Sequence, residues 1–410
     1  MQKFLARLWC RQMSQNPQIL GLTGSFGSGC SYIATNILKP SGYEFISLSE
    51  ILKEMYRQEG NEEPLEPKKR KRAFQDYGDL TRRRDGKDVF AKRAIKRIQE
   101  EVNNKKWIVD SIRNPAEIKA LRIFSSQFYL FGISAERNKR WMRVRLEFEN
   151  DFGQFEADDH NDQGDDSPEY GQKVGDCFQE SDVVITNDED FDAVGNTQFQ
   201  ELNTKVQRYI NLITNPLQGN QPPEEEVIMA MAYALSQRSS CMQRKVGAII
   251  VDENKNVISS GYNEVPKPED SCRGKYTKCY RKYKREKFYE ALIAENIILS
   301  DNKEAFEKLF KENFKILDLC RALHAEENAI LNLARNSVAV NLEKCTIYTT
   351  THPCGLCANK IAHVGIQNVV YLEPYPDSEA VTILEDNDIN RNFFEGITSR
   401  AFFRLYGGLT

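Results

Sequence analysis

The sequence predicts an α/β protein of two domains, each with a β-sheet covered by helices. β-branched and apolar runs typical of strands alternate with amphipathic segments in both halves of the chain. A glycine-rich turn at 24–29 directly follows the first such strand. A polar, proline-bearing stretch at 216–223 separates the two halves, and 410 residues are enough for two hydrophobic cores.

The first domain, 1–215, opens with a predicted buried strand at 19–23, a glycine-rich loop and a helix at 32–38. The loop has the outline of a phosphate-binding loop, with the residues Gly24, Ser25, Phe26, Gly27, Ser28, Gly29, Cys30 and Ser31. Its glycines let backbone N–H groups converge on phosphate oxygens, and Ser31 stands where a hydroxyl would meet Mg²⁺. Cys30 replaces the lysine that stabilises phosphoryl transfer, which favours nucleotide binding over catalysis. A tight turn without a ligand is the alternative.

Further strands are predicted at 107–110, 128–133 and 183–185, so this domain should contain a parallel sheet covered on both faces. The first of them ends in Asp110, a carboxylate placed to hold Mg²⁺ through water. The helix at 136–145 carries four arginines. Residues 17 to about 210 thus resemble the P-loop kinase superfamily, in which such a helix forms an arginine-bearing lid.

Three segments of the first domain have a strong charge bias. Residues 68–72 and 82–84 are basic, whereas 147–166 is rich in acidic residues. We expect these segments to be solvated surface. Binding of a triphosphate or an RNA by the basic segments is the alternative.

The second domain, 224–410, begins with a predicted helix at 224–237. Predicted strands follow at 246–251, 257–263, 346–350 and 368–372. These strands should form a mixed sheet packed against helices.

The chemistry of the second domain is indicated by two motifs, His324-Ala325-Glu326 and Pro353-Cys354-Gly355-Leu356-Cys357. One imidazole and two thiolates give Zn²⁺ three ligands and leave one tetrahedral position open, as in catalytic sites. Glu326 is close enough to hold a water at that position and move its proton. Pro353 can occupy the first turn of a helix, whose positive end favours the two thiolates. A zinc knuckle or a redox pair is the alternative, and neither explains a glutamate in fixed register with the histidine.

The H-x-E and P-C-x-x-C motifs resemble the signature of zinc-dependent nucleobase and nucleotide deaminases. Over 224–375 the resemblance is to deoxycytidylate deaminases, through those motifs and Arg238-Ser239-Ser240-Cys241, Val246-Gly247-Ala248 and Gly261-Tyr262-Asn263. It implies a cytidine-deaminase-like α/β/α fold and hydrolysis of dCTP or dCMP to the deoxyuridine nucleotide and ammonia. The whole arrangement resembles the bacterial antiviral dCTP/dCMP deaminases, which deplete the deoxycytidine nucleotide pool.

This resemblance also implies roles for single residues. Asn263 would contact the sugar, and Arg335 and Tyr375 would contact the phosphate. As activated water attacks cytosine C4, Glu326 would protonate N3 and then the departing ammonia. The backbone N–H of Ala325 would hold the ring carbonyl.

Four more cysteines raise the possibility of a second zinc. Cys241 and Cys272 match positions where phage-type deoxycytidylate deaminases hold an additional zinc, whereas the family's acidic ligand falls at Ala322. Cys279 and Cys320 could complete a site of four cysteines. The alternative is that these residues are small buried thiols.

Two other functions use the same motifs. An RNA or single-stranded DNA deaminase would use the basic insertion 273–287, with Tyr276, Tyr280 and Tyr283, as a stacking groove. A nucleotide-sensing regulator would keep the zinc as a structural ion, although the intact Glu326 argues against it.

The whole chain constrains its partners only broadly. The formal net charge is −4, and no apolar stretch approaches the length of a membrane span. We therefore expect a soluble, cytoplasmic protein, in a reducing compartment that keeps its cysteines available as ligands. The family resemblance implies a homo-oligomer, with a hexamer as the expected assembly. Regulation by an RNA or a protein is a further hypothesis.

Overall fold

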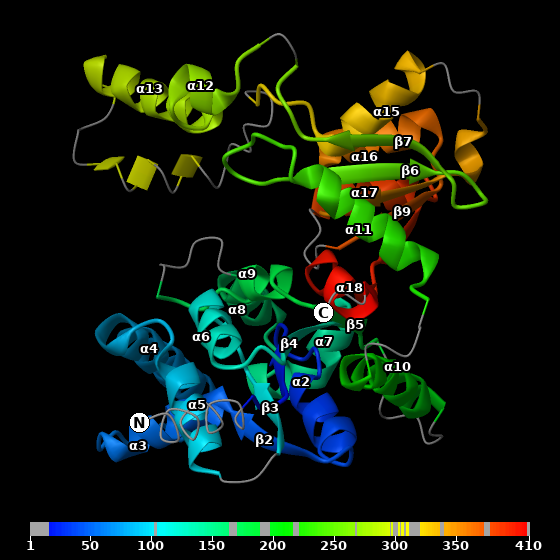
Figure 1. Cartoon of the computed structure of the whole chain (residues 1–410). Coiled ribbons are helices and arrows are strands. Elements are labelled where there is room, and N and C mark those ends of the chain that lie inside the picture. The colour runs from blue at the N-terminus through cyan, green and yellow to red at the C-terminus, as the bar shows by residue number, and fades with distance from the viewer. Residues whose placement is uncertain are drawn as a thin grey trace, which may run out of the picture. The chain divides into compact units, whose positions relative to one another are not determined.

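The computed structural model describes residues 16–101, 105–163, 170–188, 197–215, 221–266, 269–295, 297, 302–303, 305–306, 309–310, 320–336, 340–372 and 378–407. Contacts divide the chain into two compact units, which Figure 1 shows. Unit 1 comprises Met1–Gln221 and Glu395–Thr410, and unit 2 comprises Pro222–Phe394.

Unit 1 alternates strands and helices. Its elements are β1 (Ile19–Thr23), α2 (Cys30–Ile33), the π-helix η1 (Ala34–Leu38), β2 (Tyr43–Ser47), α3 (Leu48–Gln58), α4 (Pro67–Asp85), α5 (Val89–Glu100), β3 (Lys106–Asp110), α6 (Pro115–Phe124), β4 (Phe128–Ser134), α7 (Arg137–Val144), the 3₁₀ helix η2 (Arg145–Phe148), α8 (Phe152–Gln163), α9 (Val174–Gln179), β5 (Val183–Thr186), α10 (Thr197–Thr214), β11 (Gly396–Ile397) and α18 (Ser399–Tyr406).

The sheet of unit 1 has the strand order β11-β5-β4-β1-β3-β2. Strands β1 to β5 pair in parallel, as predicted, and β11 joins the β5 edge in the antiparallel direction. The prediction did not include β2 or β11. The strand β2 is interrupted by the exposed Glu44, and β11 is only two residues long, so neither has the continuous apolar run of its neighbours.

Both faces of this sheet are buried, because successive strand residues point to opposite sides. Leu20 and Leu22 pack into one core with side chains from α10 and α18. Ile19 and Val109 pack into the other core with side chains from α3, α5 and α6. β1 pairs with β3 on one side and β4 on the other, so the loop after β1 lies where the chain order reverses, a common ligand-binding position in such sheets.

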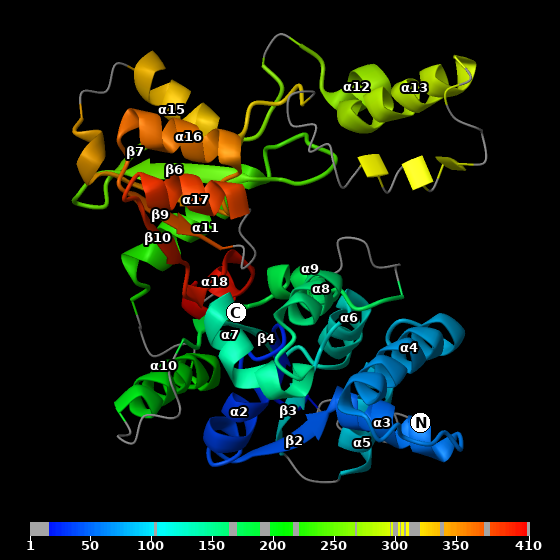
Figure 2. The same cartoon turned by 180° about the vertical axis from the view of Figure 1, so that it is seen from behind.

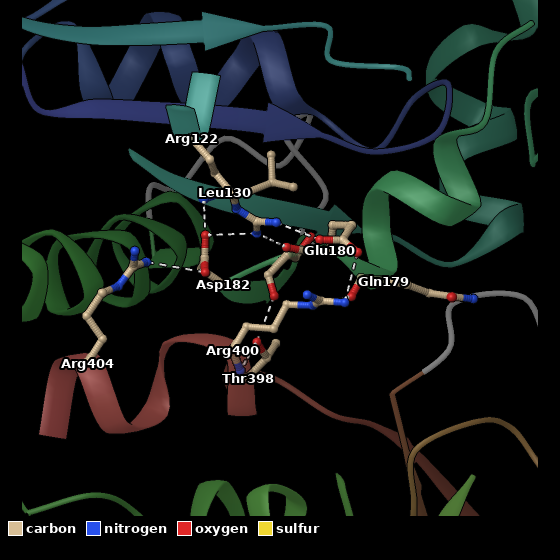
Figure 3. A network of polar contacts seen from close by, with 9 residues as sticks. Arg122, Leu130, Gln179, Glu180, Asp182, Thr398, Arg400 and Arg404 are labelled. Atoms are coloured by element: carbon tan, nitrogen blue, oxygen red, sulfur yellow. Dashed lines mark hydrogen bonds and ion pairs between the residues drawn. The ribbon is translucent and has the colours of Figure 1, made fainter. Parts of the chain in front are cut away.

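The last residues of the chain correct the predicted domain boundary. The sequence placed all of 224–410 in the second domain, whereas 395–410 belong to unit 1. Thr398 anchors this return segment: its N–H donates to the Asp182 carbonyl at 3.0 Å and its hydroxyl donates to the Ser181 carbonyl at 2.7 Å (Figure 3). Ile397, Ala401 and Leu405 are buried in the core of unit 1. Burial of these apolar side chains stabilises the position of the segment in unit 1.

Unit 2 contains a mixed sheet with the order β10-β9-β8-β6-β7. Its elements are α11 (Glu224–Ser236), β6 (Gly247–Val251), β7 (Val257–Tyr262), α12 (Cys272–Tyr276), α13 (Tyr280–Ala294), α15 (Ala325–Arg335), the 3₁₀ helix η4 (Leu342–Lys344), β8 (Thr346–Thr349), α16 (Gly355–Val364), β9 (Asn368–Tyr371), α17 (Ser378–Asp386) and β10 (Asn390–Phe393). The mixed sheet predicted from the sequence is confirmed, with β7 and β8 antiparallel to β6 and the other pairs parallel.

Helices cover both faces of this second sheet. α15, α16 and α17 pack on one face, and α11 packs on the other, as both views show (Figures 1 and 2). Gly261 brings β7 unusually close to α15, since a Cβ there would lie 2.3 Å from the Ala325 carbonyl oxygen. This contact fixes the start of α15 against the sheet.

None of the helices in the described part of the chain combines the length and apolar character needed to cross a membrane.

Candidate active site

The three predicted metal ligands lie together at the starts of two neighbouring helices. His324 is the N-cap residue of α15, and Cys354 is the N-cap residue of α16. The sequence placed Pro353 in the first turn, but α16 begins two residues later, at Gly355. The sulfur atoms of Cys354 and Cys357 lie 3.3 and 3.4 Å from His324 Nδ1.

This arrangement suits a zinc ion. The donor atoms of His324, Cys354 and Cys357 all lie within 4.8 Å of one another, and within the described ranges no other three His, Cys, Asp or Glu residues form such a group. One imidazole and two sulfurs leave a fourth tetrahedral position for a water or a substrate atom. Both cysteines face the positive ends of helix dipoles, which favour the thiolate forms that bind metals.

Glu326 lies beside these ligands in the first turn of α15. Its side chain is only 3% exposed. The Thr349 hydroxyl, at the end of β8, donates to Glu326 Oε1 at 3.3 Å, and the Cys357 thiol lies 3.7 Å from Oε2. Sequence reasoning missed Thr349, whose only signal was its place at the end of a strand next to the P-C-x-x-C motif.

The protonation states reflect burial and close contact. Burial raises the pKa of Glu326, so the carboxyl is a better proton carrier near neutrality than an exposed glutamate. Hydrogen bonds from Cys357 and His324 lower the pKa of Cys354 to about 4, whereas the bond to Cys354 and burial raise the pKa of Cys357. Bonds to Cys320 and Cys354 raise the pKa of His324 to about 10.

A carboxylate and a lysine brace the helices that carry these ligands. Glu327 Oε2 accepts a hydrogen bond from the His324 backbone N–H at 3.3 Å, and Glu327 Oε1 lies 3.0 Å from Lys360 Nζ on α16. The pair therefore links the start of α15 to the helix of the cysteines. Such outer contacts orient metal ligands.

The predicted substrate contacts are placed differently. Ala325 is buried as the first residue of α15, directly beside the metal group. Asn263 is 9% exposed, and its amide accepts from Val246 N at 2.8 Å and donates to the Arg244 carbonyl at 2.8 Å, so this side chain holds the turn after β7.

Of the two predicted phosphate contacts, the structure describes only Arg335, which is not brought to the metal group. Arg335 is exposed at the far end of α15, about 16 Å along the helix axis from His324. Tyr375 lies outside the described residues.

The four cysteines suggested for a second metal share one small cavity. Cys241, Cys272, Cys279 and Cys320 line a space of about 30 Å³ between the turn after α11, the inserted helices and the segment before His324. Cys320 also hydrogen-bonds to His324, which lowers the pKa of the Cys320 thiol. The four sulfurs are not drawn into a compact ligand group in the described residues.

The glycine-rich loop of unit 1 is fixed through its carbonyl groups. Arg140 donates to the Phe26 carbonyl at 3.2 Å, and Arg143 donates to the Gly27 carbonyl at 3.0 Å. Gly29 has a φ of 94°, and a Cβ there would lie 2.2 Å from Asn187 Nδ2. Only glycine therefore fits this point of the loop.

Ser31 and Asp110 meet as the sequence suggested. Ser31 Oγ donates to Asp110 Oδ2 at 2.7 Å, while Asp110 Oδ1 is buried without a hydrogen-bond partner. Hydroxyl and carboxylate oxygens are the ligands that Mg²⁺ accepts together with water and phosphate. Burial, and then the charge of Asp110, raises the pKa of Cys30 to about 12, so this thiol is neutral and cannot replace the missing lysine.

The charged segments of unit 1 pair with each other instead of remaining only solvated. Lys71 lies 3.1 Å from Asp158, and Lys68 lies 3.8 Å from Asp151. Arg140, one of the four arginines on the helix compared with a kinase lid, is 4% exposed and binds both carboxylate oxygens of Asp159 at 2.6 and 2.7 Å. Arg140 therefore stabilises the loop and α8.

Unit 2 thus has the fold and the ligand group of a zinc-binding deaminase. Residues 222–373 match the family described as "Cytidine and deoxycytidylate deaminase zinc-binding region". The deoxycytidylate deaminase of Schizosaccharomyces pombe is 34% identical over 40% of this chain and 42% of its own length. That of Enterobacteria phage T2 is 32% identical over 36% of this chain and 79% of its own length. The chain belongs to the deoxycytidylate deaminase family, through unit 2.

These matches have a limited extent. The chain spans less than half the length of its fungal relatives, 42% for S. pombe and 46% for Saccharomyces cerevisiae. A crystal structure of dCMP deaminase from the cyanophage S-TIM5, in complex with dCMP and dUMP, matches 43% of this chain and 100% of that chain at 23% identity. The TM-score of this match is 0.29.

Proposed function

We propose that unit 2 catalyses the zinc-dependent hydrolysis of dCMP to dUMP and ammonia. The main support for this proposal is the buried Glu326 carboxylate, which lies beside the metal-binding atoms of His324, Cys354 and Cys357. A structural zinc site is completed by protein ligands, whereas this group supplies three donors and a carboxylate outside the ligand set. Membership in the deoxycytidylate deaminase family supports the choice of substrate.

The residues divide the chemistry between them. His324 Nδ1 and the sulfurs of Cys354 and Cys357 would hold the zinc, which when bound lowers the pKa of a coordinated water to near neutrality. Glu326 would take a proton from the attacking water, give it to ring N3, and carry the next proton to the leaving ammonia. Thr349 holds one oxygen of Glu326, which limits the carboxylate to a narrow range of positions. The N–H of Ala325 would meet the ring carbonyl.

A finer proposal is that dCTP is also a substrate and that the activity depletes the nucleotide pool in antiviral defence, in a homo-oligomer. The resemblance of the whole arrangement to antiviral dCTP/dCMP deaminases supports it. The RNA or DNA deaminase alternative has less support, because the Tyr276 ring lies against those of Tyr280 and Tyr283, with centroids 4.7 and 5.2 Å away. Rings packed on one another have less surface for bases.

Release of ammonia would test the main proposal. We expect turnover of dCMP, or of dCMP and dCTP, and none of cytidine-containing oligonucleotides. The Glu326→Ala and Cys354→Ala variants should be inactive. Equal turnover in Glu326→Ala, or a preference for oligonucleotides, would contradict the proposal.

For unit 1 we propose the binding of a Mg²⁺–nucleotide without efficient phosphoryl transfer. Backbone N–H groups of 24–31 would meet the phosphates, and Ser31 with Asp110 would hold the ion. The unpartnered, buried Asp110 Oδ1 supports this assignment. Calorimetry should detect Mg²⁺–ATP binding that Ser31→Ala weakens, and phosphate transfer from ATP to nucleosides at an ordinary kinase rate would contradict it.

We also propose that Cys241, Cys272, Cys279 and Cys320 can close on a second zinc. Their shared cavity, of about 30 Å³, supports the proposal because this space would hold a water molecule, and a zinc ion is smaller than a water molecule. Small rotations of four thiols would be needed to bring the sulfurs together. This site would attach the inserted helices α12 and α13 to the segment that leads into His324.

A further inference from the structure

The residue directly before the P-C-x-x-C motif is a buried histidine. None of the sequence motifs assigns a role to His352, yet its side chain is only 8% exposed. It lies in the short segment that leads from the end of β8 to Cys354, the N-cap residue of α16. A buried imidazole needs hydrogen-bond partners within the fold, because it has lost those that it would have in water. The partners of His352 therefore show what this side chain holds in place.

The first partner is the carbonyl group of Pro353. The Nδ1 atom of His352 lies 2.8 Å from the Pro353 oxygen, and since a carbonyl can only accept, Nδ1 carries the proton and donates. That oxygen belongs to the planar peptide unit that ends at the Cα atom of Cys354. The hydrogen bond therefore limits the rotation of this peptide plane. Pro353 has no N–H group, so the preceding peptide has no donor that could fix the turn instead.

The second partner is the ring of Tyr371. The two ring centres are 4.5 Å apart with an interplanar angle of 81°, an edge-to-face contact of the kind that aromatic rings prefer. Tyr371 is the last residue of β9 and is 7% exposed. Its carbonyl accepts from the Phe394 N–H at 2.7 Å, and its ring contacts that of Phe393. The sheet thus holds Tyr371, and Tyr371 fixes the direction of the imidazole.

The support of His352 lies next to the support of the catalytic carboxyl. In the parallel pair of β8 and β9, Tyr371 is the register partner of Thr349, whose hydroxyl donates to Glu326. Neighbouring positions at the ends of two strands therefore hold two parts of the site. Thr349 supports Glu326. Tyr371 supports the turn to Cys354 through His352. A change in the direction of the imidazole would move the Cys354 sulfur relative to the Glu326 carboxyl.

We propose that His352 is a positioning residue for the zinc ligand Cys354. Its hydrogen bond to the Pro353 carbonyl keeps the Cys354 sulfur facing His324 Nδ1, which lies 3.3 Å away. This role rests on the zinc-dependent deamination proposed for unit 2 and adds a residue to it. Removal of such an outer contact typically lowers metal affinity by about 10–100-fold.

Two substitutions separate the hydrogen bond from the ring. His352→Phe keeps a ring against Tyr371 without a donor, whereas His352→Asn places an amide N–H near the position of Nδ1. In competition with a chelator, we expect His352→Phe to bind zinc at least about tenfold more weakly and His352→Asn to recover most of that loss. His363→Phe makes the same change at an exposed histidine of α16 and should leave the affinity unchanged. Thermal unfolding checks the fold, and His352→Leu, which also lacks a donor, replaces His352→Phe if that variant does not fold.

Cobalt substitution gives a readout that does not depend on turnover. The absorption of Co²⁺ bound to thiolates reports the geometry of the sulfurs. It should shift in His352→Phe and resemble that of the native protein in His352→Asn. With zinc saturating, His352→Phe should lower kcat for dCMP at least about tenfold and change KM less than about threefold, because the groups that would bind the substrate are unchanged.

Three outcomes decide the matter. Native zinc affinity and native Co²⁺ absorption in His352→Phe would overturn the positioning role, even if the native protein deaminates dCMP. Equal losses in His352→Phe and His352→Asn would also overturn it, because the hydrogen bond would not be their cause. If the native protein does not deaminate dCMP but the variants differ in zinc affinity as expected, the positioning role stands and the proposed substrate is wrong.

Discussion

The Arg404 guanidinium lies 3.3 Å from a carboxylate oxygen of Asp182 (Figure 3). It also lies 3.9 Å from the centre of the Tyr129 ring. Asp182 is 3% exposed, and its other oxygen accepts from the Leu130 N–H at 2.8 Å. Burial raises the pKa of this carboxyl, and the charge of Arg404 opposes that effect. These contacts join α18, the last helix of the chain, to the start of β5 and to β4. In the sequence, the whole of unit 2 lies between α18 and these strands.

Arg404→Ala should destabilise unit 1 by about 1–2 kcal/mol. This is less than the roughly 3–5 kcal/mol for breaking a fully buried pair, because the Arg404 side chain is 39% exposed and Asp182 keeps other donors. Denaturant unfolding measures the change. Arg400 is in the same helix as Arg404 and forms a surface ion pair with Glu180. The Arg400→Ala variant should lower the free energy of unfolding by less than about 1 kcal/mol. Equal effects of the two variants would contradict the assigned role.

Glu326→Gln should lower dCMP turnover by at least about 10²-fold without loss of zinc, since the amide cannot carry protons to N3 and ammonia. Glu343→Gln is the matched control: it makes the same change at an exposed position in η4, outside the ligand group. Turnover should remain within a few-fold of the native value there. Steady-state kinetics with metal analysis checks both, and a Glu326→Gln variant as active as Glu343→Gln would remove Glu326 from the mechanism.

Cys30 should resist alkylation at pH 8. Its pKa of about 12, against 9.0 for an ordinary thiol, makes its thiolate on the order of 10³-fold scarcer at that pH. Because the folded pKa lies above the unfolded one, the contribution of Cys30 to stability is complete below pH 9 and is lost as the pH rises towards 12. Peptide mass spectrometry after iodoacetamide treatment, native against urea-unfolded, measures the rate. Equal rates in the two states would show an ordinary thiol.

The proposed second zinc predicts two ions per chain by metal analysis. Cys272→Ser should reduce the content to one ion, and Cys354→Ser should remove the other. Cys345→Ser, a buried cysteine outside both groups, should retain two. A content of one ion in the intact protein would end the proposal.

Local sequence determined the chemistry and much of the fold. His324, Cys354 and Cys357 were predictable because metal ligands at helix starts face one ion whatever surrounds them. Glu326 was predictable because it follows the histidine by two residues, within the same helix start. The strands at 19–23, 107–110 and 246–251 were predictable because they are continuous apolar runs.

Only the tertiary structure decided the features that depend on residues far apart in sequence. Thr349 meets Glu326 through the pairing of β8 within the sheet, and Asn263 turns inward because the Val246 and Arg244 backbones need partners. The return of 395–410 to unit 1 depends on a two-residue strand and a long-range ion pair, neither of which has a local signal. The contact between His352 and Tyr371 likewise exists only because the turn after β8 meets the end of β9, and packing is a property of the whole fold.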